Sequence, residues 1–210
     1  MSKPSILLVG AGGHARACID VIEQEGRFTV AGLVGLSHEI GTRMLGYPVL
    51  GTDADLLALL GDYGNALVTV GQIKTPEKRI QLFDLLERNG FVMPTVVSPH
   101  AYVSPHAQLG AGTIVMHGVV VNAGAVVGRN CILNSQSLVE HDVRISDHCH
   151  ISTAAAINSG VCIGAGTFIG SCSSVRQCIS IGERCLIGIG QRVLANCEAG
   201  THMPPSRRLL

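Results

Sequence analysis

The second half of the chain carries an aliphatic residue at every sixth position. The series starts at Val97 and runs to Val193, so that seventeen consecutive hexapeptides each begin with Val, Leu or Ile. The fifth residue of a hexad is nearly always small or β-branched, as in Ala107, Cys131 and Val143. A repeat of this length constrains the fold more strongly than the propensity of any single segment.

The hexads fit neither an α-helix nor a simple alternating strand. Apolar residues at offsets 0 and 4 in every six predict short strands separated by turns, with three strands closing one triangular coil. The seventeen hexads then build between five and six coils, stacked at about 4.8 Å. Fifth-position side chains should point inward, where little room exists, and the absence of Trp from the chain agrees with this.

The first 95 residues follow a different pattern, in which short apolar runs alternate with helical segments. We expect strands at 5–9, 28–34 and 66–70, and helices at 17–25, 54–60 and 76–89. Such alternation is typical of a small parallel α/β unit. The sequence therefore predicts an α/β, Rossmann-like domain over residues 1–95 and an all-β parallel helix over residues 96–210.

A glycine-rich loop joins the first expected strand to the first expected helix. It contains Gly10, Gly12 and Gly13 and is followed by His14. A loop of this kind offers backbone N–H groups to an anion at a helix N-terminus, although glycines also serve tight turns. NAD fits poorly, because the spacing is G-x-G-G and no carboxylate follows the second strand before Glu39.

Composition narrows the remaining possibilities. The formal net charge is zero and there is no long basic run, which argues against a nucleic-acid partner. We found no apolar stretch of membrane-spanning length and no signal-peptide pattern, so a cytoplasmic protein without membrane insertion is expected. Four of the eight cysteines occupy inward fifth positions, where a thiol acts as a small apolar group: Cys131, Cys149, Cys185 and Cys197.

A histidine between two carboxylates supplies a candidate general base. His141 is the third residue of its hexad, away from the packed first and fifth positions, so its ring should face outward. Imidazole takes up a proton near neutral pH, and Asp142 or Glu140 could orient it. Eighteen residues further on, one coil away at the same corner, the backbone N–H of Ser159 could donate to an oxyanion that develops beside the base.

The hexads resemble those of the hexapeptide-repeat acyltransferases, whose parallel β-helix is left-handed. The glycine loop ending in Gly-His, the segment 46–51 and the repeat that follows are similar, over nearly the whole chain, to bacterial sugar acetyltransferases of the sialic-acid and bacillosamine pathways. This resemblance implies acetyl-CoA as co-substrate, no metal, and a homotrimer with active sites at subunit interfaces. It also implies a nucleotide-linked amino sugar, with UDP as the expected nucleotide, held near Gly10, Gly12, Gly13 and His14.

The same resemblance assigns roles to individual residues. His141 matches the general base, Asp142 the carboxylate that tunes it, and Asn134 an asparagine seven residues earlier. His150 matches a second histidine near the thioester. Positive charge is also needed for the phosphates of CoA, and the candidates in the later coils and tail are Arg176, Arg184, Arg192, Arg207 and Arg208.

The leading hypothesis is therefore an acetyl-CoA-dependent N-acetyltransferase acting on a nucleotide-linked amino sugar. An O-acetyltransferase of the same fold is the nearest alternative. A zinc hydratase like the β-helical carbonic anhydrases would use three histidines, for which His117, His141 and His148 are candidates. A third possibility is a noncatalytic sensor of nucleotide sugars.

Overall fold

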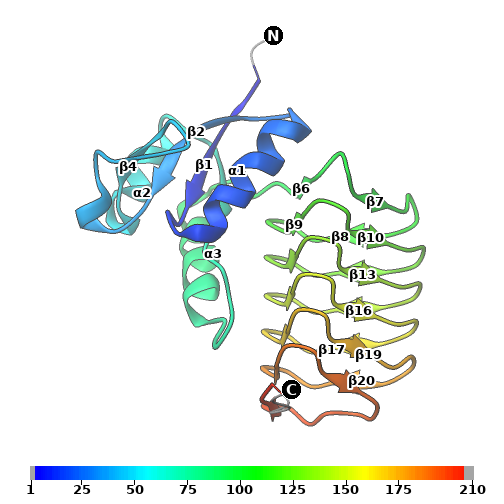
Figure 1. The fold of residues 1–210 in the computed structure, drawn as a ribbon. Helices are drawn as coiled ribbons and strands as arrows, with labels where there is room; N and C mark the ends of the chain where they lie inside the picture. The colour runs from blue at the N-terminus through cyan, green and yellow to red at the C-terminus, as the bar shows by residue number, and fades with distance from the viewer. Residues whose placement is uncertain (1–2, 206–210) are drawn as a thin grey trace.

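The computed structural model describes residues 3–205, which form an α/β lobe and a solenoid lying beside it (Figure 1). The α/β lobe contains β1 (Ser5–Val9), α1 (Gly13–Glu25), β2 (Thr29–Val34), β3 (Arg43–Met44), β4 (Tyr47–Gly51), α2 (Leu56–Leu60), β5 (Asn65–Val68) and α3 (Glu77–Asn89). Its strands lie in the order β3-β4-β2-β1-β5. All neighbouring pairs are parallel except β3 with β4.

The alternation predicted for the α/β lobe is present, with two differences. Helix α1 begins at Gly13 rather than at residue 17, because Gly12 serves as its N-cap and the glycine loop leads directly into the first turn. An antiparallel hairpin of β3 and β4 was not anticipated. Its turn places Leu45 and Gly46 at positive φ, the geometry that tight hairpins favour.

The solenoid consists of two-residue strands, each of which ends on the first residue of a hexad up to β22. They are β6 (Val96–Val97), β7 (Tyr102–Val103), β8 (Gln108–Leu109), β9 (Ile114–Val115), β10 (Val120–Val121), β11 (Val126–Val127), β12 (Ile132–Leu133), β13 (Leu138–Val139), β14 (Arg144–Ile145), β15 (His150–Ile151), β16 (Ala156–Ile157), β17 (Cys162–Ile163), β18 (Phe168–Ile169), β19 (Ser174–Val175), β20 (Ser180–Ile181), β21 (Leu186–Ile187), β22 (Arg192–Val193) and β23 (His202–Met203).

Strands 18 residues apart pair in parallel, as Val121 pairs with Val139, and they form three flat sheets. Inward side chains of the central coils are fully buried, among them Cys131, Val143 and Cys149. The fourth residue of many hexads turns the chain at positive φ, which Asp142 adopts at 61°. The repeat is lost after β22, since β23 pairs with β21 at a spacing of 16 residues.

One sheet of the solenoid faces the α/β lobe. This docking sheet consists of β6, β9, β12, β15, β18, β21 and β23. Its outward residues include Ile114, Ile132, His150 and Phe168, all of them buried. The lobes are also joined by Arg79 of α3, which is 1% exposed and donates to the carbonyl oxygen and Oδ1 of Asn130 at 2.8 and 2.7 Å.

Within residues 3–205, none of the helices has the length and apolar character needed to cross a bilayer.

Candidate active site

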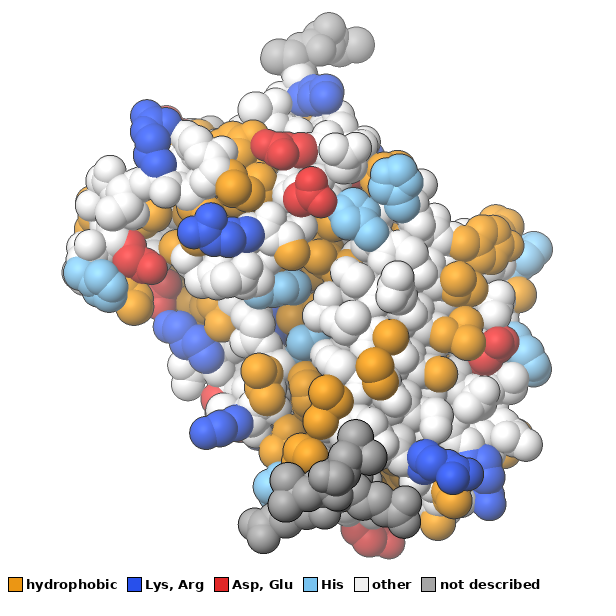
Figure 2. Space-filling view, viewed as in Figure 1, with side chains coloured by type: hydrophobic (Ala, Val, Ile, Leu, Met, Phe, Trp, Pro, Cys, Tyr) orange, Lys and Arg blue, Asp and Glu red, His pale blue; other side chains and the backbone are white. Residues whose placement is uncertain are grey.

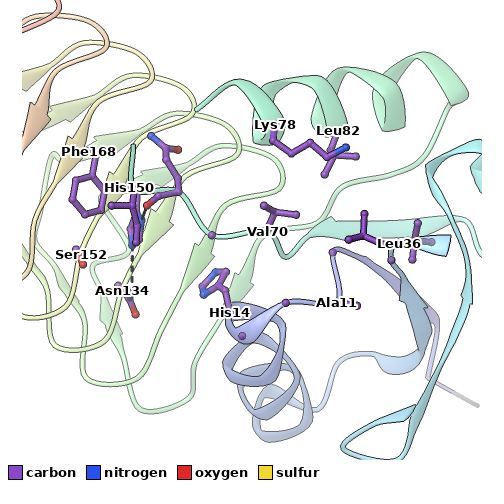
Figure 3. Close-up of a pocket in the computed structure, with 18 of the residues that line it drawn as sticks. Ala11, His14, Leu36, Val70, Lys78, Leu82, Asn134, His150, Ser152 and Phe168 are labelled. Atoms are coloured by element: carbon purple, nitrogen blue, oxygen red, sulfur yellow. Dashed lines mark hydrogen bonds between the residues drawn. The ribbon is translucent and has the colours of Figure 1, made fainter. Parts of the chain in front are cut away.

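A cavity of about 720 Å³ lies between the two lobes, within the size range of ligand pockets. Its α/β wall is formed where β1, β2, β4 and β5 end, the edge at which open parallel sheets bind ligands. Its other wall is the docking sheet. Histidine side chains are visible in the hollow between the lobes in Figure 2, and Figure 3 shows His14 facing the solenoid residues His150 and Asn134.

The three glycines of the loop differ in whether their surroundings leave room for a side chain. At Gly10, φ is +122° and a Cβ would lie 2.5 Å from the Cγ2 of Val70, so that packing alone demands glycine. At Gly12 and Gly13 a Cβ would meet nothing within 4 Å. Both open glycines line the cavity, and their backbone faces it at the N-terminus of α1. This arrangement can accept an anion such as a diphosphate.

His14 is the second residue of α1 and lines the same cavity. Its buried Nε2 has no hydrogen-bond partner within the described residues. Burial, together with the nearby positive charge of Arg79 and of a protonated His150, lowers the pKa of His14 to about 3. The ring is therefore neutral near pH 7.

His150 and Asn134 form the solenoid wall beside it. The Nδ1–H of His150 donates to the backbone oxygen of Gln72 at 2.7 Å, and the amide of Asn134 donates to His150 Nε2 at 3.3 Å (Figure 3). Oδ1 of Asn134 accepts from the N–H of Ser135 at 2.8 Å, which sets the orientation of the amide. Burial lowers the pKa of His150 to about 4. The structure thus brings together His14, Asn134 and His150 as a neutral polar wall.

Several lining residues were missed from the sequence. Phe168 stands edge-on to His150 with ring centroids 5.1 Å apart, and the hydroxyls of Ser152 and Ser171 share a hydrogen bond of 2.9 Å. A signal was present, because the outward residues 114, 132, 150 and 168 recur at 18-residue spacing and are large. On the sheet of β8, β11, β14, β17 and β20, by contrast, several outward residues are polar, among them Gln108, Arg144 and Ser180.

The end of the cavity away from the solenoid carries charged groups. Nζ of Lys78 lies 2.7 Å from Oδ2 of Asp53. Glu39 also lines this end, with Leu36 and Val34 beside it. No carboxylate precedes Glu39 after the second strand, as the sequence shows, but Glu39 itself folds back to the end of that strand, where it accepts a hydrogen bond from the N–H of Leu36 at 2.7 Å.

His141 and Asp142 lie outside this cavity. They follow β13 at a corner of the solenoid, with side chains 59% and 73% exposed, and Nδ1 of His141 is 2.9 Å from Oδ2 of Asp142. The ring faces outward, as its hexad position indicates. A single chain therefore does not bring His141 to Asn134 and His150.

The candidates for binding acetyl-CoA are also divided between locations. Ser159 lies one coil from His141 at the same corner, since the N–H of Gly160 donates to the His141 oxygen at 3.1 Å. Arg176 and Arg192 are exposed, Arg176 at this corner and Arg192 on β22. Arg184 instead forms an ion pair with Glu77 of the α/β lobe. Arg207 and Arg208 lie outside the described residues.

The three histidines of the hydratase hypothesis do not converge within one chain. His117 bonds to Asp20 at 2.8 Å, His148 accepts from Asn130 at 3.0 Å, and His141 bonds to Asp142. Each ring is thus engaged with a different polar neighbour.

Comparisons with known proteins identify the fold and chemistry. Residues 5–83 match the family model described as the PglD N-terminal domain. A search of curated protein sequences gave no match. The acetyltransferase domain of PglB from Neisseria gonorrhoeae, solved with acetyl coenzyme A, is 28% identical over 97% of each chain, with a TM-score of 0.88. WeeI from Acinetobacter baumannii shares the fold at 22% identity, covering 98% of this chain and all of that one, with a TM-score of 0.85.

A further match is a variant of perosamine N-acetyltransferase from Caulobacter crescentus, in complex with CoA and GDP-perosamine. It is 30% identical over 97% of this chain and 94% of its own, with a TM-score of 0.90. These similarities confirm the parallel β-helix predicted from the hexads, the left hand that the family resemblance implied for it, and acetyl-CoA as the acyl donor of the enzyme. The chain belongs to the hexapeptide-repeat sugar N-acetyltransferase family.

Proposed function

We propose that the protein transfers the acetyl group of acetyl-CoA to the amino group of a nucleotide-linked sugar, at a site built from two copies of the chain. One observation carries this proposal. The cavity of a single chain holds a neutral polar wall, whereas the exposed His141–Asp142 pair stands at another edge of the solenoid. A neighbouring copy would bring its own His141 to the cavity.

Of the three histidines considered, His141 is best suited to act as the general base. With Nδ1–H donating to Asp142, Nε2 of His141 is free to take the proton of the attacking amine. His150 is a weaker base, because its pKa is about 4 and its Nε2 already accepts from Asn134. The pKa of His14 is lower still.

The acyl-transfer step follows from this assignment. The sugar amine attacks the thioester carbon and its proton passes to His141. The tetrahedral intermediate then breaks its bond to the sulfur of CoA, which takes that proton from His141 and leaves as the thiol. The backbone N–H of Ser159 has no acceptor within residues 3–205 and lies one coil away, which supports it as a donor to the oxyanion. Arg176 and Arg192 are proposed to meet the CoA phosphates.

The nucleotide is proposed to lie across the α/β end of the cavity. The open backbone at Gly12 and Gly13 supports a diphosphate there, with the sugar pointing toward His14 and Asn134. The relative from Caulobacter crescentus was solved with GDP-perosamine, so GDP is a second candidate nucleotide in addition to the UDP expected from the sequence. In this proposal residues 1–95 hold the nucleotide sugar and residues 96–210 carry acyl transfer.

Side chains on a second sheet support a homotrimer. On the sheet of β7, β10, β13, β16, β19 and β22, four of the six outward residues form an apolar stripe without a partner in the described chain, namely Tyr102, Val120, Leu138 and Ala156, and the other two are Ser174 and Arg192. His141 follows β13 of this sheet, so the stripe runs alongside the corner that carries His141. Packing of identical stripes and edges about a closed symmetry axis would cover it, and light scattering would give the mass of the assembly.

The experiment is acetyl transfer from acetyl-CoA to a panel of UDP-, GDP- and dTDP-linked amino sugars. Mass spectrometry should find an amide on one of them, and His141→Ala should lower kcat by roughly 10²- to 10⁴-fold. Asp142→Asn should cause a smaller loss, since it only orients the ring. Near-normal turnover by His141→Ala would contradict the base assignment, and an ester product would contradict N-acetylation.

A further inference from the structure

Glu39 returns a carboxylate to the end of β2, although it lies five residues beyond that strand. Ser37–Glu39 forms one turn of 3-10 helix, which folds the side chain back toward the strand. Oε2 of Glu39 accepts the N–H of Leu36 at 2.7 Å. A Cβ on Gly35 would lie only 2.6 Å from that oxygen. The carboxylate therefore occupies the space that a side chain at position 35 would fill.

The charges around Glu39 indicate what it can bind. Glu39 is half-buried and lines the same cavity as Gly12 and Gly13. The other carboxylate at this end, Asp53, is paired with Lys78. Within residues 3–205, Glu39 forms no ion pair. An uncompensated carboxylate repels phosphate but is a strong acceptor for a hydroxyl group.

We propose that Glu39 accepts a hydrogen bond from the ribose 2′-hydroxyl and thereby selects ribonucleotide sugars over 2′-deoxyribonucleotide sugars. This inference rests on the proposed nucleotide-sugar function. In doubly wound α/β domains, an acidic residue at the end of the second strand bonds the ribose when a diphosphate sits at the first helix. Here the glycine loop lies at the start of the first helix, and the 3-10 turn brings the carboxylate of Glu39 to the end of the second strand.

The test measures binding of UDP, GDP, 2′-deoxy-UDP and 2′-deoxy-GDP by calorimetry, without acetyl-CoA. For whichever base binds, we expect the deoxy form to bind about 10- to 100-fold more weakly. In Glu39→Gln, the amide oxygen can still accept the Leu36 N–H, but the charged acceptor is gone, so this ratio should fall to within about threefold. Asp53→Asn is the matched control, because it removes a carboxylate from the same cavity and should leave the ratio unchanged.

A rescue variant guards against a merely structural effect. Glu39→Ala should lose the preference, and Glu39→Asp, which returns a carboxylate to the same position, should restore part of it. Equal binding of ribo and deoxy forms to the wild type, or an undiminished preference in Glu39→Gln, would overturn the role of Glu39. If neither UDP nor GDP binds, the nucleotide-binding proposal itself fails and takes this inference with it.

Discussion

Lowering the pH from about 7 to about 5 should destabilise the protein, because His14 and His150 are buried in the neutral form between the lobes. The pKa values are about 3 and about 4, both below the ordinary value of 6.5. Between these values the unfolded chain binds more protons than the folded one. The stabilisation is therefore complete above about pH 6.5 and is lost as the pH falls toward 4.

The size of the effect follows from these values. At pH 5 both histidines are still mostly neutral in the folded protein, because their pKa values there lie below 5. The fall in the free energy of unfolding between pH 7 and pH 5 therefore depends mainly on the pKa of histidine in the unfolded chain, about 6.5. Each histidine should then lower the free energy of unfolding by about 2 kcal/mol between pH 7 and pH 5. The two together should contribute about 4 kcal/mol.

Urea unfolding at fixed protein concentration measures this dependence, since assembly also affects stability. The double variant His14→Gln and His150→Gln should lose most of the acid sensitivity between pH 7 and pH 5, whatever its stability at pH 7. An equal fall in the free energy of unfolding in the wild type and the double variant would refute the assignment of these histidines as buried neutral groups.

Three further predictions concern the cavity and the contact between the lobes. Gly10→Ala should destabilise the fold by about 1–3 kcal/mol, measured by urea unfolding, because the methyl group would collide with Val70. Gly13→Val should fold normally but raise KM for the nucleotide sugar about tenfold or more without changing KM for acetyl-CoA. An unchanged KM for the nucleotide sugar would show that the glycine loop is only a packing turn. Arg79→Met should cost about 2–4 kcal/mol, since it leaves both oxygens of Asn130 without their donor; calorimetric unfolding unchanged from the wild type would contradict this.

The solenoid could be predicted in detail because every coil obeys the same rule. Each hexad places an aliphatic side chain at its first position and a small one at its fifth, because the interior of the coil is narrow. This requirement involves only neighbouring residues and repeats in every hexad. The corner position of His141 and the stacking of Ser159 beside it follow from counting in eighteens. The outward direction of His141 follows from its third position in the hexad.

The cavity could not be predicted in the same way, because it depends on how two different lobes pack. Counting in eighteens places Phe168 beside His150, but nothing in the periodic pattern indicates that Gln72 of the other lobe meets the same ring. The return of Glu39 to the end of β2 could not be predicted from its distance along the chain, because it depends on the missing side chain of Gly35. Such contacts arise from packing between segments that a periodic pattern does not relate.

The central claim is that His141 of one chain serves the cavity of another. It is tested most directly by hybrid assemblies of two impaired variants, His141→Ala and Gly13→Val, carrying different tags, purified through both tags and assayed at a nucleotide-sugar concentration below the wild-type KM. If each site takes its cavity from one chain and its base from the neighbour, a hybrid trimer should contain about one intact site in three. Acetyl transfer at about one third of the wild-type rate is the predicted result, and hybrids no more active than either parent variant would contradict the account.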